Sequence, residues 1–217
     1  MGKESEFDMM SVYFWDEYLK DVPLCKDFVD NYQTIKHEIL EYLKLPDALF
    51  DYPMYMVEGD NNQGIPLYEN YWKAIPMTNF EGEFLADYAS PDEKRFFNFL
   101  IERTKRLCPF TNSLIEGLEN EGHLKNCFIS RLLPGSIINP HRGWTDEFMR
   151  IHLGLVCDPE CKITVGEETR TWEEGKLIAF EDGGKYLHSV VHNGTEERII
   201  LSVDVRISYL TTWLNNL

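Results

Sequence analysis

Two histidines in the second half of the chain have the residue type and the surroundings that metal chemistry needs. His141 is followed by Arg142 and Gly143, and His188 comes much later in a separate apolar segment. Neutral imidazoles from separate strands can bind Fe(II), and such iron oxygenases usually add one carboxylate while leaving positions open for substrate and oxygen. That carboxylate normally lies two residues after the first histidine, where this chain has Gly143. The glycine leaves the third coordination position to water or to an exogenous anion.

Two arginines near these histidines could bind a dicarboxylate beside the metal. Arg150 lies two residues before His152, and Arg198 follows His188 in the next predicted strand. The planar guanidinium makes paired, charge-assisted hydrogen bonds with a carboxylate, which suits the far end of 2-oxoglutarate. An unpaired guanidinium in an apolar strand is costly unless an anion meets it, and this favours a ligand role over a surface salt bridge.

The second metal ligand has two candidates. His188 and His192 share a face if one strand runs through both, because alternate residues of a strand point the same way. The spacing to the downstream arginine favours His188, and His192 remains the rival. Asp146 and Asp182 are further candidates for the mouth of the site, whereas Trp144 and Trp172 are expected to be packing residues.

The second half of the chain has the pattern of many short strands. From about residue 125, β-branched and aromatic runs alternate with turn signals such as Pro134-Gly135 and Asn193-Gly194. Segment 197–206 alternates between an apolar face and a face with arginine and serine. Such a sheet fits a barrel or jelly roll that holds a polar ligand in its mouth. We expect a mainly β fold with flanking α-helices and a double-stranded β-helix core (jelly roll, cupin-like).

The first half is expected to be richer in helix. Apolar residues at helical spacing predict one amphipathic helix over 27–44. Ser90-Pro91 is a typical helix start, and the following helix should carry Phe96, Phe97, Leu100 and Ile101 toward a core. No repeat or flexible linker separates the halves. We therefore expect a single oxygenase domain over 1–217, with a helix-rich part (1–125) that buttresses a jelly-roll core (126–217).

The composition limits the class of partner. The chain has 217 residues, 43% of them hydrophobic, which suits one core of above-average size. Its net charge of −16 gives a surface that repels nucleic acid and anionic lipid. We find no apolar run near the roughly 18 residues that span a membrane and no signal-peptide core, so a cytoplasmic location is predicted. Five cysteines, an odd number, are expected to be reduced thiols.

Residues 130–206 resemble the aspartyl/asparaginyl β-hydroxylase family of Fe(II)- and 2-oxoglutarate-dependent oxygenases. A weaker similarity extends upstream to about residue 70, and residues 1–65 show none. The resemblance is carried by the runs 134–135 (Pro-Gly), 140–143 (Pro-His-Arg-Gly), 150–156 (Arg-Ile-His-Leu-Gly-Leu-Val), 171–176 (Thr-Trp-Glu-Glu-Gly-Lys) and 203–205 (Val-Asp-Val).

The resemblance implies a role for each site residue. In that family two histidines alone bind the iron, which corresponds to His141 and His188 here. Ser130 and Arg198 would hold the distal carboxylate of the cosubstrate 2-oxoglutarate. Arg150 and His152 would face its keto-acid end, and O2 would bind at the open side of the iron.

The implied reaction is hydroxylation of an unactivated C–H bond, with release of succinate and CO2. Phe148 stands where animal members carry an arginine that engages the substrate, and segment 180–188 is two residues longer than usual. The family's Asp or Asn in an EGF-like domain is therefore not expected to carry over. We expect the substrate to be an amino-acid residue in a peptide or an amino-acid-like small molecule.

Two other functions are compatible with these residues. A halogenase would use the open coordination site beside Gly143 for chloride, although hydroxylating members of the family also have glycine there. A non-catalytic cupin-like binding module would keep the fold without turnover.

Overall fold

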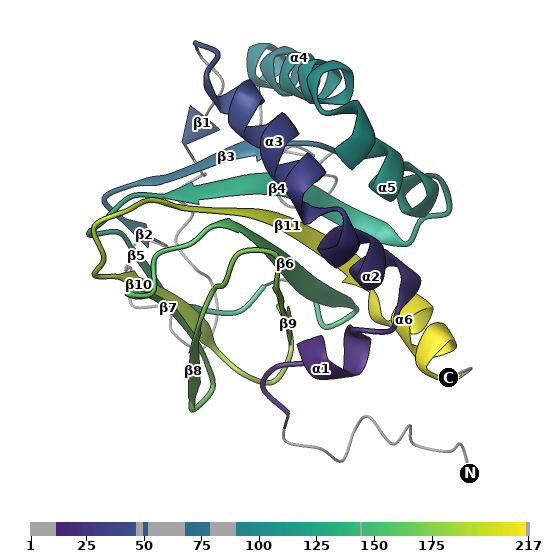
Figure 1. Cartoon of the computed structure of the whole chain (residues 1–217), viewed down its shortest axis with the longest axis vertical. Coiled ribbons are helices and arrows are strands. Elements are labelled where there is room, and N and C mark those ends of the chain that lie inside the picture. The colour runs from purple at the N-terminus through teal and green to yellow at the C-terminus, as the bar shows by residue number, and fades with distance from the viewer. Residues whose placement is uncertain (1–11, 47–49, 52–67, 79–89, 144, 216–217) are drawn as a thin grey trace.

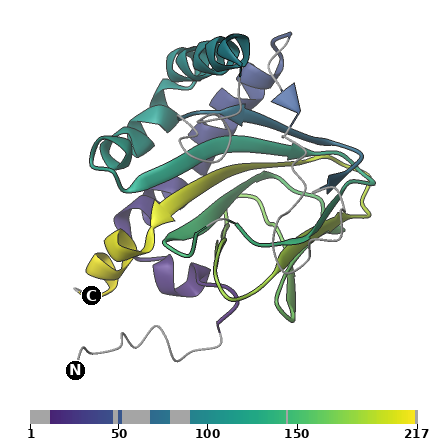
Figure 2. The ribbon, with the colours of Figure 1, turned by 180° about the vertical axis from the view of Figure 1, so that it is seen from behind.

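The computed structural model describes residues 12–46, 50–51, 68–78, 90–143 and 145–215. Within these residues, two antiparallel sheets face each other and helices cover the outer side of the larger one (Figure 1). Seen from behind, the larger sheet again lies between the helices and the smaller sheet (Figure 2). This arrangement is the double-stranded β-helix with flanking helices that the strand pattern predicts, so the predicted fold class is confirmed.

The larger sheet has the strand order β1-β3-β4-β11-β6-β9, and the smaller sheet has the order β2-β5-β10-β7-β8. The strands of the larger sheet are β1 (Phe50–Asp51), β3 (Trp72–Pro76), β4 (Leu124–Leu132), β11 (Arg198–Arg206), β6 (Phe148–Val156) and β9 (Leu177–Glu181). Those of the smaller sheet are β2 (Tyr68–Glu69), β5 (Ile137–His141), β10 (His188–His192), β7 (Cys161–Val165) and β8 (Glu168–Thr171).

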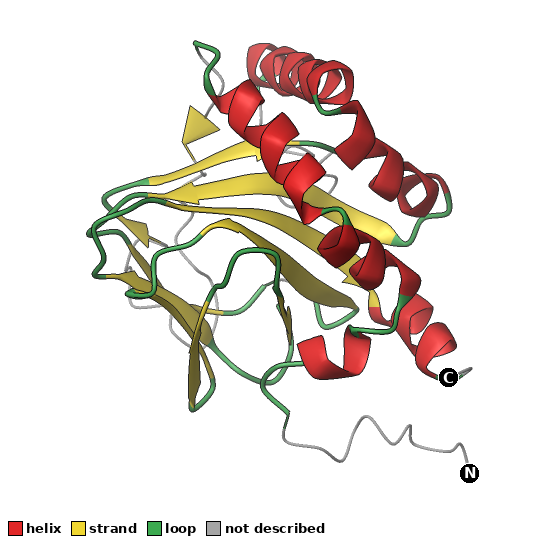
Figure 3. Ribbon diagram, in the orientation of Figure 1, coloured by secondary structure: helices red, strands yellow, loops and turns green. Residues whose placement is uncertain are grey.

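The helices lie against one face of the larger sheet (Figure 3). They are α1 (Asp16–Leu19), α2 (Pro23–Asp30), α3 (Tyr32–Leu43), α4 (Pro91–Leu107), α5 (Pro109–Asn120) and α6 (Ile207–Leu214). Ile151 of β6 and Val203 of β11 point toward them, in one buried cluster with Phe28, Ile35 and Ile39. Because alternate residues of a strand point to opposite faces, the residues between these apolar ones face the smaller sheet. The helices therefore leave the inner face of the larger sheet to the site residues.

Two helical features differ from the sequence prediction. The helix expected over 27–44 is two helices, α2 and α3, which are separated at Asn31. The Asn31 side-chain amide donates to the Asp27 carbonyl over 2.8 Å, an interaction by which asparagine competes with the helical backbone. In α4, which begins at Pro91 as predicted, Phe97 and Leu100 are buried but Phe96 is 42% exposed. Phe96 lies outside the stripe that faces the core.

The part of the chain before residue 125 contributes strands as well as helices. Strand β3 lies between β1 and β4 in the larger sheet, and β2 forms one edge of the smaller sheet. The expected helix-rich part thus completes both sheets of the jelly roll. The assignment of residues 1–217 to a single domain stays a prediction.

Other sequence expectations can be compared with the structure directly. All five cysteines, each of which lies in the described part of the chain, are free thiols. None of the helices in the described residues is long and apolar enough to cross a membrane.

Gly154 of β6 is predicted to be essential for packing. A Cβ at this position would lie 2.9 Å from Cys157 Sγ and 2.9 Å from the carbonyl carbon of Glu173, and backbone atoms cannot move aside cheaply. We expect Gly154→Ala to lower the free energy of unfolding by about 1–3 kcal/mol, as overpacking does. Denaturant titration followed by circular dichroism measures the change.

Gly117 provides the matched control for that substitution. It lies inside α5, and no described atom would come within 4 Å of an added Cβ. Gly117→Ala should therefore stabilise the protein by about 0.5–1 kcal/mol through helix propensity. Equal stability of Gly154→Ala and the wild type would contradict the packing argument.

Candidate active site

A cavity between the two sheets brings together all of the site residues predicted from the sequence. Its wall includes Ser130, His141, Arg150, His152, His188 and Arg198. The larger sheet contributes the serine, both arginines and His152, and the smaller sheet contributes the other two histidines. Each of these side chains is buried. The structure therefore places the predicted residues in one site, whereas their chemical roles stay predictions.

His141 and His188 lie side by side on neighbouring strands. They are direct partners in the β5–β10 register, and their ring centroids are 4.1 Å apart. His141 Nδ1 donates to the carbonyl of Asn139 over 2.7 Å, which leaves the Nε2 lone pair available to a metal. Burial lowers the pKa of His141 to about 4 and that of His188 well below its usual value. Both rings are thus neutral at physiological pH, which is the form that binds metals.

His192, the rival for the second metal ligand, lies outside this cavity wall. It is fully buried at the far end of β10, and its Nδ1 accepts the backbone N–H of Gly194 over 3.3 Å. Of the two candidates, only His188 faces His141. Trp144 lies outside the described residues.

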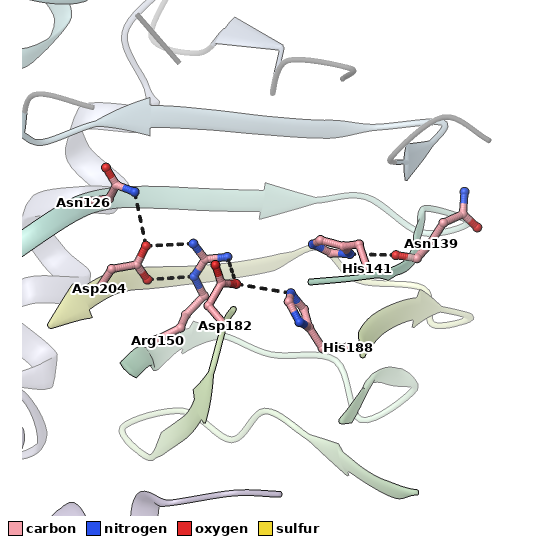
Figure 4. A network of polar contacts seen from close by, with 7 residues as sticks. All are labelled: Asn126, Asn139, His141, Arg150, Asp182, His188 and Asp204. Carbon is pink, nitrogen blue, oxygen red and sulfur yellow. Dashed lines mark hydrogen bonds and ion pairs between the residues drawn. The ribbon is translucent and has the colours of Figure 1, made fainter. Parts of the chain in front are cut away.

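Arg150 is neutralised by two aspartates of the protein itself (Figure 4). Its Nε and Nη2 each donate to a different oxygen of Asp204, both over 2.8 Å. Its Nη1 lies 2.5 Å from Asp182 Oδ1, and Asn126 supports Asp204 through a 3.2 Å hydrogen bond. The sequence predicted that an anion would meet this guanidinium. In the structure the anions are carboxylates of the chain, because the β6–β11 register sets Asp204 directly opposite Arg150.

Arg198 is buried and has no carboxylate partner among the described residues. It is 2% exposed, its Nη2 donates to Ser130 Oγ over 2.8 Å, and its guanidinium lies 4.9 Å from the centre of the Trp172 ring. Its Nε finds no hydrogen-bond acceptor in the described part of the chain. Burial lowers the pKa of Arg198 to about 10, so the group still carries its charge at neutral pH. A buried cation of this kind is costly without a compensating charge, so an anion that reached it would be stabilised.

His152 lines the same cavity as the histidine pair and Arg198. The indole N–H of Trp172 donates to His152 Nδ1 over 3.3 Å, so a neutral His152 carries its proton on Nε2. Burial lowers the pKa of His152 well below its usual value, which keeps the ring neutral. Trp172, predicted to be a packing residue, is buried and contacts both His152 and Arg198. It therefore helps to orient two of the cavity side chains.

Sequence reasoning missed the residues that support the site. Trp72 of β3 donates to Ser130 Oγ over 2.9 Å, across a long stretch of sequence. Asp204 stands at an inward position of the strand pattern and within the run 203–205 of the resemblance, but neither signal gave it a role. Asp182, which the sequence left as one of two candidates, is buried between Arg150 and His188, whereas Asp146 is exposed.

The donor set fits a metal held by two histidines. No group of three His, Cys, Asp or Glu side chains within the described ranges is arranged to hold a metal ion. His141 and His188 are neutral, adjacent and buried, and a carbonyl accepts the Nδ1–H of His141, the kind of hydrogen bond that orients metal-binding histidines. A metal bound here would have two protein ligands and several open positions.

The chain is similar in sequence to known beta-hydroxylases. The family model for aspartyl/asparaginyl beta-hydroxylase matches residues 29–207. The mouse aspartate beta-hydroxylase domain-containing protein 2 is 35% identical over 149 residues, which cover 64% of this chain and 43% of that protein. The mouse aspartyl/asparaginyl beta-hydroxylase is 47% identical over 73 residues, which cover 33% of this chain and 10% of that protein. The chain thus spans less than half the length of these relatives.

Solved structures give a more distant match. The viral collagen prolyl hydroxylase of Paramecium bursaria Chlorella virus-1, solved as its 2OG complex, has a TM-score of 0.35 and 14% sequence identity. The alignment covers 54% of this chain and 75% of that one.

Acid is predicted to destabilise the folded protein at the pH where histidines titrate in the unfolded chain. Burial lowers the folded-state pKa of His141, His152 and His188, whereas unfolding returns each to about 6.5. Below that pH the unfolded state binds more protons, so the free energy of unfolding falls as the pH decreases. For His141 the loss continues down to its folded-state pKa of about 4.

The measurement is the free energy of unfolding of metal-free protein between pH 7.5 and 5. His152→Gln removes one of these titrating groups and should reduce the slope by at most about 1.4 kcal/mol per pH unit. A wild-type stability that stays constant across this range would show that these histidines are not buried in their neutral form.

Proposed function

Because the chain belongs to the aspartyl/asparaginyl β-hydroxylase family, we propose that it is an Fe(II)- and 2-oxoglutarate-dependent oxygenase that hydroxylates an unactivated C–H bond. The observation that carries the proposal is the buried Arg198, a cation with no acidic partner in the described chain, in one cavity with His141 and His188. A pair of neutral histidines suits the metal, and a buried guanidinium suits the distal carboxylate of the cosubstrate.

His141 and His188 would hold the iron through their neutral rings. Bound Fe(II) and 2-oxoglutarate would supply the chemistry: O2 gives one oxygen atom to succinate and the other to the substrate hydroxyl, and CO2 is released. The protein excludes bulk water, since both histidines and the surrounding side chains are buried. Phe180 lies against His188 and His152, with ring centroids 4.9 and 5.3 Å away, and limits how these two rings can turn.

Ser130 and Arg198 would hold the distal carboxylate of 2-oxoglutarate. Ser130 Oγ accepts N–H groups from both Trp72 and Arg198, so its own O–H is left to donate to a ligand. Arg198 offers Nε as a further donor. Together they present a hydroxyl and a charged N–H group to one carboxylate, which is the pairing that charge-assisted recognition favours.

Arg150 and His152 would face the keto-acid end of the cosubstrate. His152 contributes an Nε2–H donor, because its Nδ1 already accepts from Trp172. The Arg150 guanidinium, which Asp204 and Asp182 hold in place, would lie beside this end of the cosubstrate.

The substrate we propose is an amino-acid residue in a peptide or an amino-acid-like small molecule. Phe148 precedes Arg150 by two residues, so both point to the inner face of β6. The Arg206 guanidinium and the Lys125 ammonium lie 4.7 and 5.6 Å from the centre of the Phe148 ring. These three residues line a separate pocket beside the start of β6, outside the wall of the cavity that holds His141 and His188.

Metal binding tests the assignment of the two ligands. His141→Ala and His188→Ala should each weaken Fe(II) binding by at least about 100-fold, because even loss of a second-shell partner costs 10–100-fold. His192→Ala should bind Fe(II) like the wild type. Anaerobic equilibrium dialysis measures the affinity, and circular dichroism checks that each variant is folded. Loss of iron in His192→Ala alone would make His188 the wrong second ligand.

Cosubstrate binding tests the role of Arg198. Arg198→Met should weaken 2-oxoglutarate binding by about 10–100-fold, since a hydrogen bond to a charged group contributes about 1.5–3 kcal/mol. Titration calorimetry with Mn(II) in place of iron measures the affinity without turnover. Arg131→Met is the control, because Arg131 pairs with Glu197 and lies outside the cavity wall. Equal affinities for the two variants would contradict the proposal, and so would no succinate from wild type with Fe(II), 2-oxoglutarate, O2 and any candidate peptide or amino-acid substrate.

A further inference from the structure

The place that Gly143 leaves in the site is filled by another residue. A Cβ added to Gly143 would lie 2.6 Å from the carboxyl carbon of Asp182, and Asp182 Oδ2 would be the nearest atom to it. The carboxyl carbon of an aspartate at position 143 would lie one C–C bond, about 1.5 Å, from that Cβ. The two carboxylates would therefore compete for the same volume. Asp182 thus places its carboxylate where the side chain of an aspartate at position 143 would lie.

The backbone holds Asp182 in this position. The N–H of Gly143 donates to the Asp182 carbonyl over 2.8 Å, which ties the end of β9 to the segment after β5. The next residue, Gly183, packs so closely that a Cβ would lie 2.7 Å from the backbone nitrogen of Thr145. Asp182 itself is only 5% exposed. The two segments thus pack closely at two glycines, and the Asp182 carboxylate lies against Arg150 and His188.

Asp182 contacts two other side chains of the site. Its Oδ1 lies 2.5 Å from Arg150 Nη1 and 3.3 Å from His188 Nε2 (Figure 4). Arg150 also binds Asp204, so one guanidinium is shared by two carboxylates. An exogenous anion would meet a position that the Asp182 carboxylate already occupies.

We propose that Asp182 determines the specificity of the reaction by keeping chloride and other small anions off the metal bound by His141 and His188. The inference rests on the proposed two-histidine iron site. A halogenase needs an open position beside the metal where chloride binds. Here Asp182 closes that position, and the site is committed to hydroxylation although residue 143 is a glycine.

Cobalt binding tests this inference without any turnover. Co(II) is added as the sulfate to chloride-free protein with 2-oxoglutarate, and chloride then replaces sulfate at constant ionic strength. The readouts are the visible absorption of Co(II), which changes when chloride enters the coordination shell, and the Kd of the metal. Wild-type protein should show no response to chloride in either one.

Two substitutions separate the charge of Asp182 from its volume. Asp182→Ala removes both, and Asp182→Asn removes the charge while keeping the shape. We expect chloride to change the Co(II) spectrum of Asp182→Ala and to tighten its metal binding by about tenfold when chloride is about tenfold above its own Kd. Asp182→Asn should give the same change or a smaller one, and it tests the charge in a protein of unchanged packing. Asp146→Ala, which removes an exposed aspartate, should behave like the wild type.

The outcomes are distinguishable. Chloride sensitivity in an Asp182 variant, absent from the wild type and from Asp146→Ala, supports the inference. A chloride-sensitive wild type, or folded Asp182 variants that both ignore chloride, overturns it while leaving the iron site intact. Failure of the wild type to bind Co(II) would instead overturn the proposed iron site, and this inference with it.

Discussion

The site depends on one buried cation, the guanidinium of Arg150, which two aspartates share. Arg150 and Asp204 are cross-strand partners in the larger sheet, whereas Asp182 lies beyond β9, on the segment that leads into the smaller sheet. The ion cluster therefore ties together the strands that carry the site and the loop that precedes His188. Removing one partner from a buried ion pair generally costs about 3–5 kcal/mol, because a charge is left without compensation. The position of His188 relative to the larger sheet is thus coupled to this cluster.

Two buried arginines face the same cavity with opposite electrostatic balance. Arg150 has two carboxylates within hydrogen-bonding distance. Arg198 has a serine hydroxyl and the face of Trp172, neither of which carries a compensating charge. An anion gains more by approaching the uncompensated cation. The electrostatic potential therefore favours an anionic group at the Arg198 end of the cavity before any ligand enters. A dicarboxylate would bind with one end at Arg198 and its other end toward the histidines, which is the orientation that the proposed reaction requires.

Much of this site was accessible from the sequence because its residues follow local rules. Strand alternation placed Arg150 and His152 on one face, and the turn at Asn193-Gly194 separated the strands of His188 and Arg198. The supporting residues could not be found in this way. Trp72 reaches Ser130 because β3 pairs with β4, and Asp204 meets Arg150 because of the β6–β11 register. Register belongs to a pair of strands, so the residue pattern of a single strand cannot predict it.

The helices illustrate the same limit on a smaller scale. The apolar stripe over 27–44 correctly identified a buried helical face. Such a periodic pattern cannot reveal that a single residue within it breaks the helix. The break falls at Asn31, whose side-chain amide donates to the Asp27 carbonyl. Phe96 has the right residue type for a core, yet the stripe that α4 buries includes Phe97, Leu100 and Ile101 instead. Which residues a helix buries is decided by the surface it packs against.

The spacing between His141 and Gly143 in the sequence does not by itself describe the surroundings of the metal site. Read along the chain, a glycine two residues after a metal-binding histidine means that the usual carboxylate ligand is missing. In the folded protein the same glycine is what allows Asp182 to approach, because any side chain at 143 would collide with that carboxylate. Gly183 makes the reciprocal approach possible on the other segment. The two glycines therefore let the two segments pack closely. The absence of a side chain at 143 makes room for the carboxylate of Asp182.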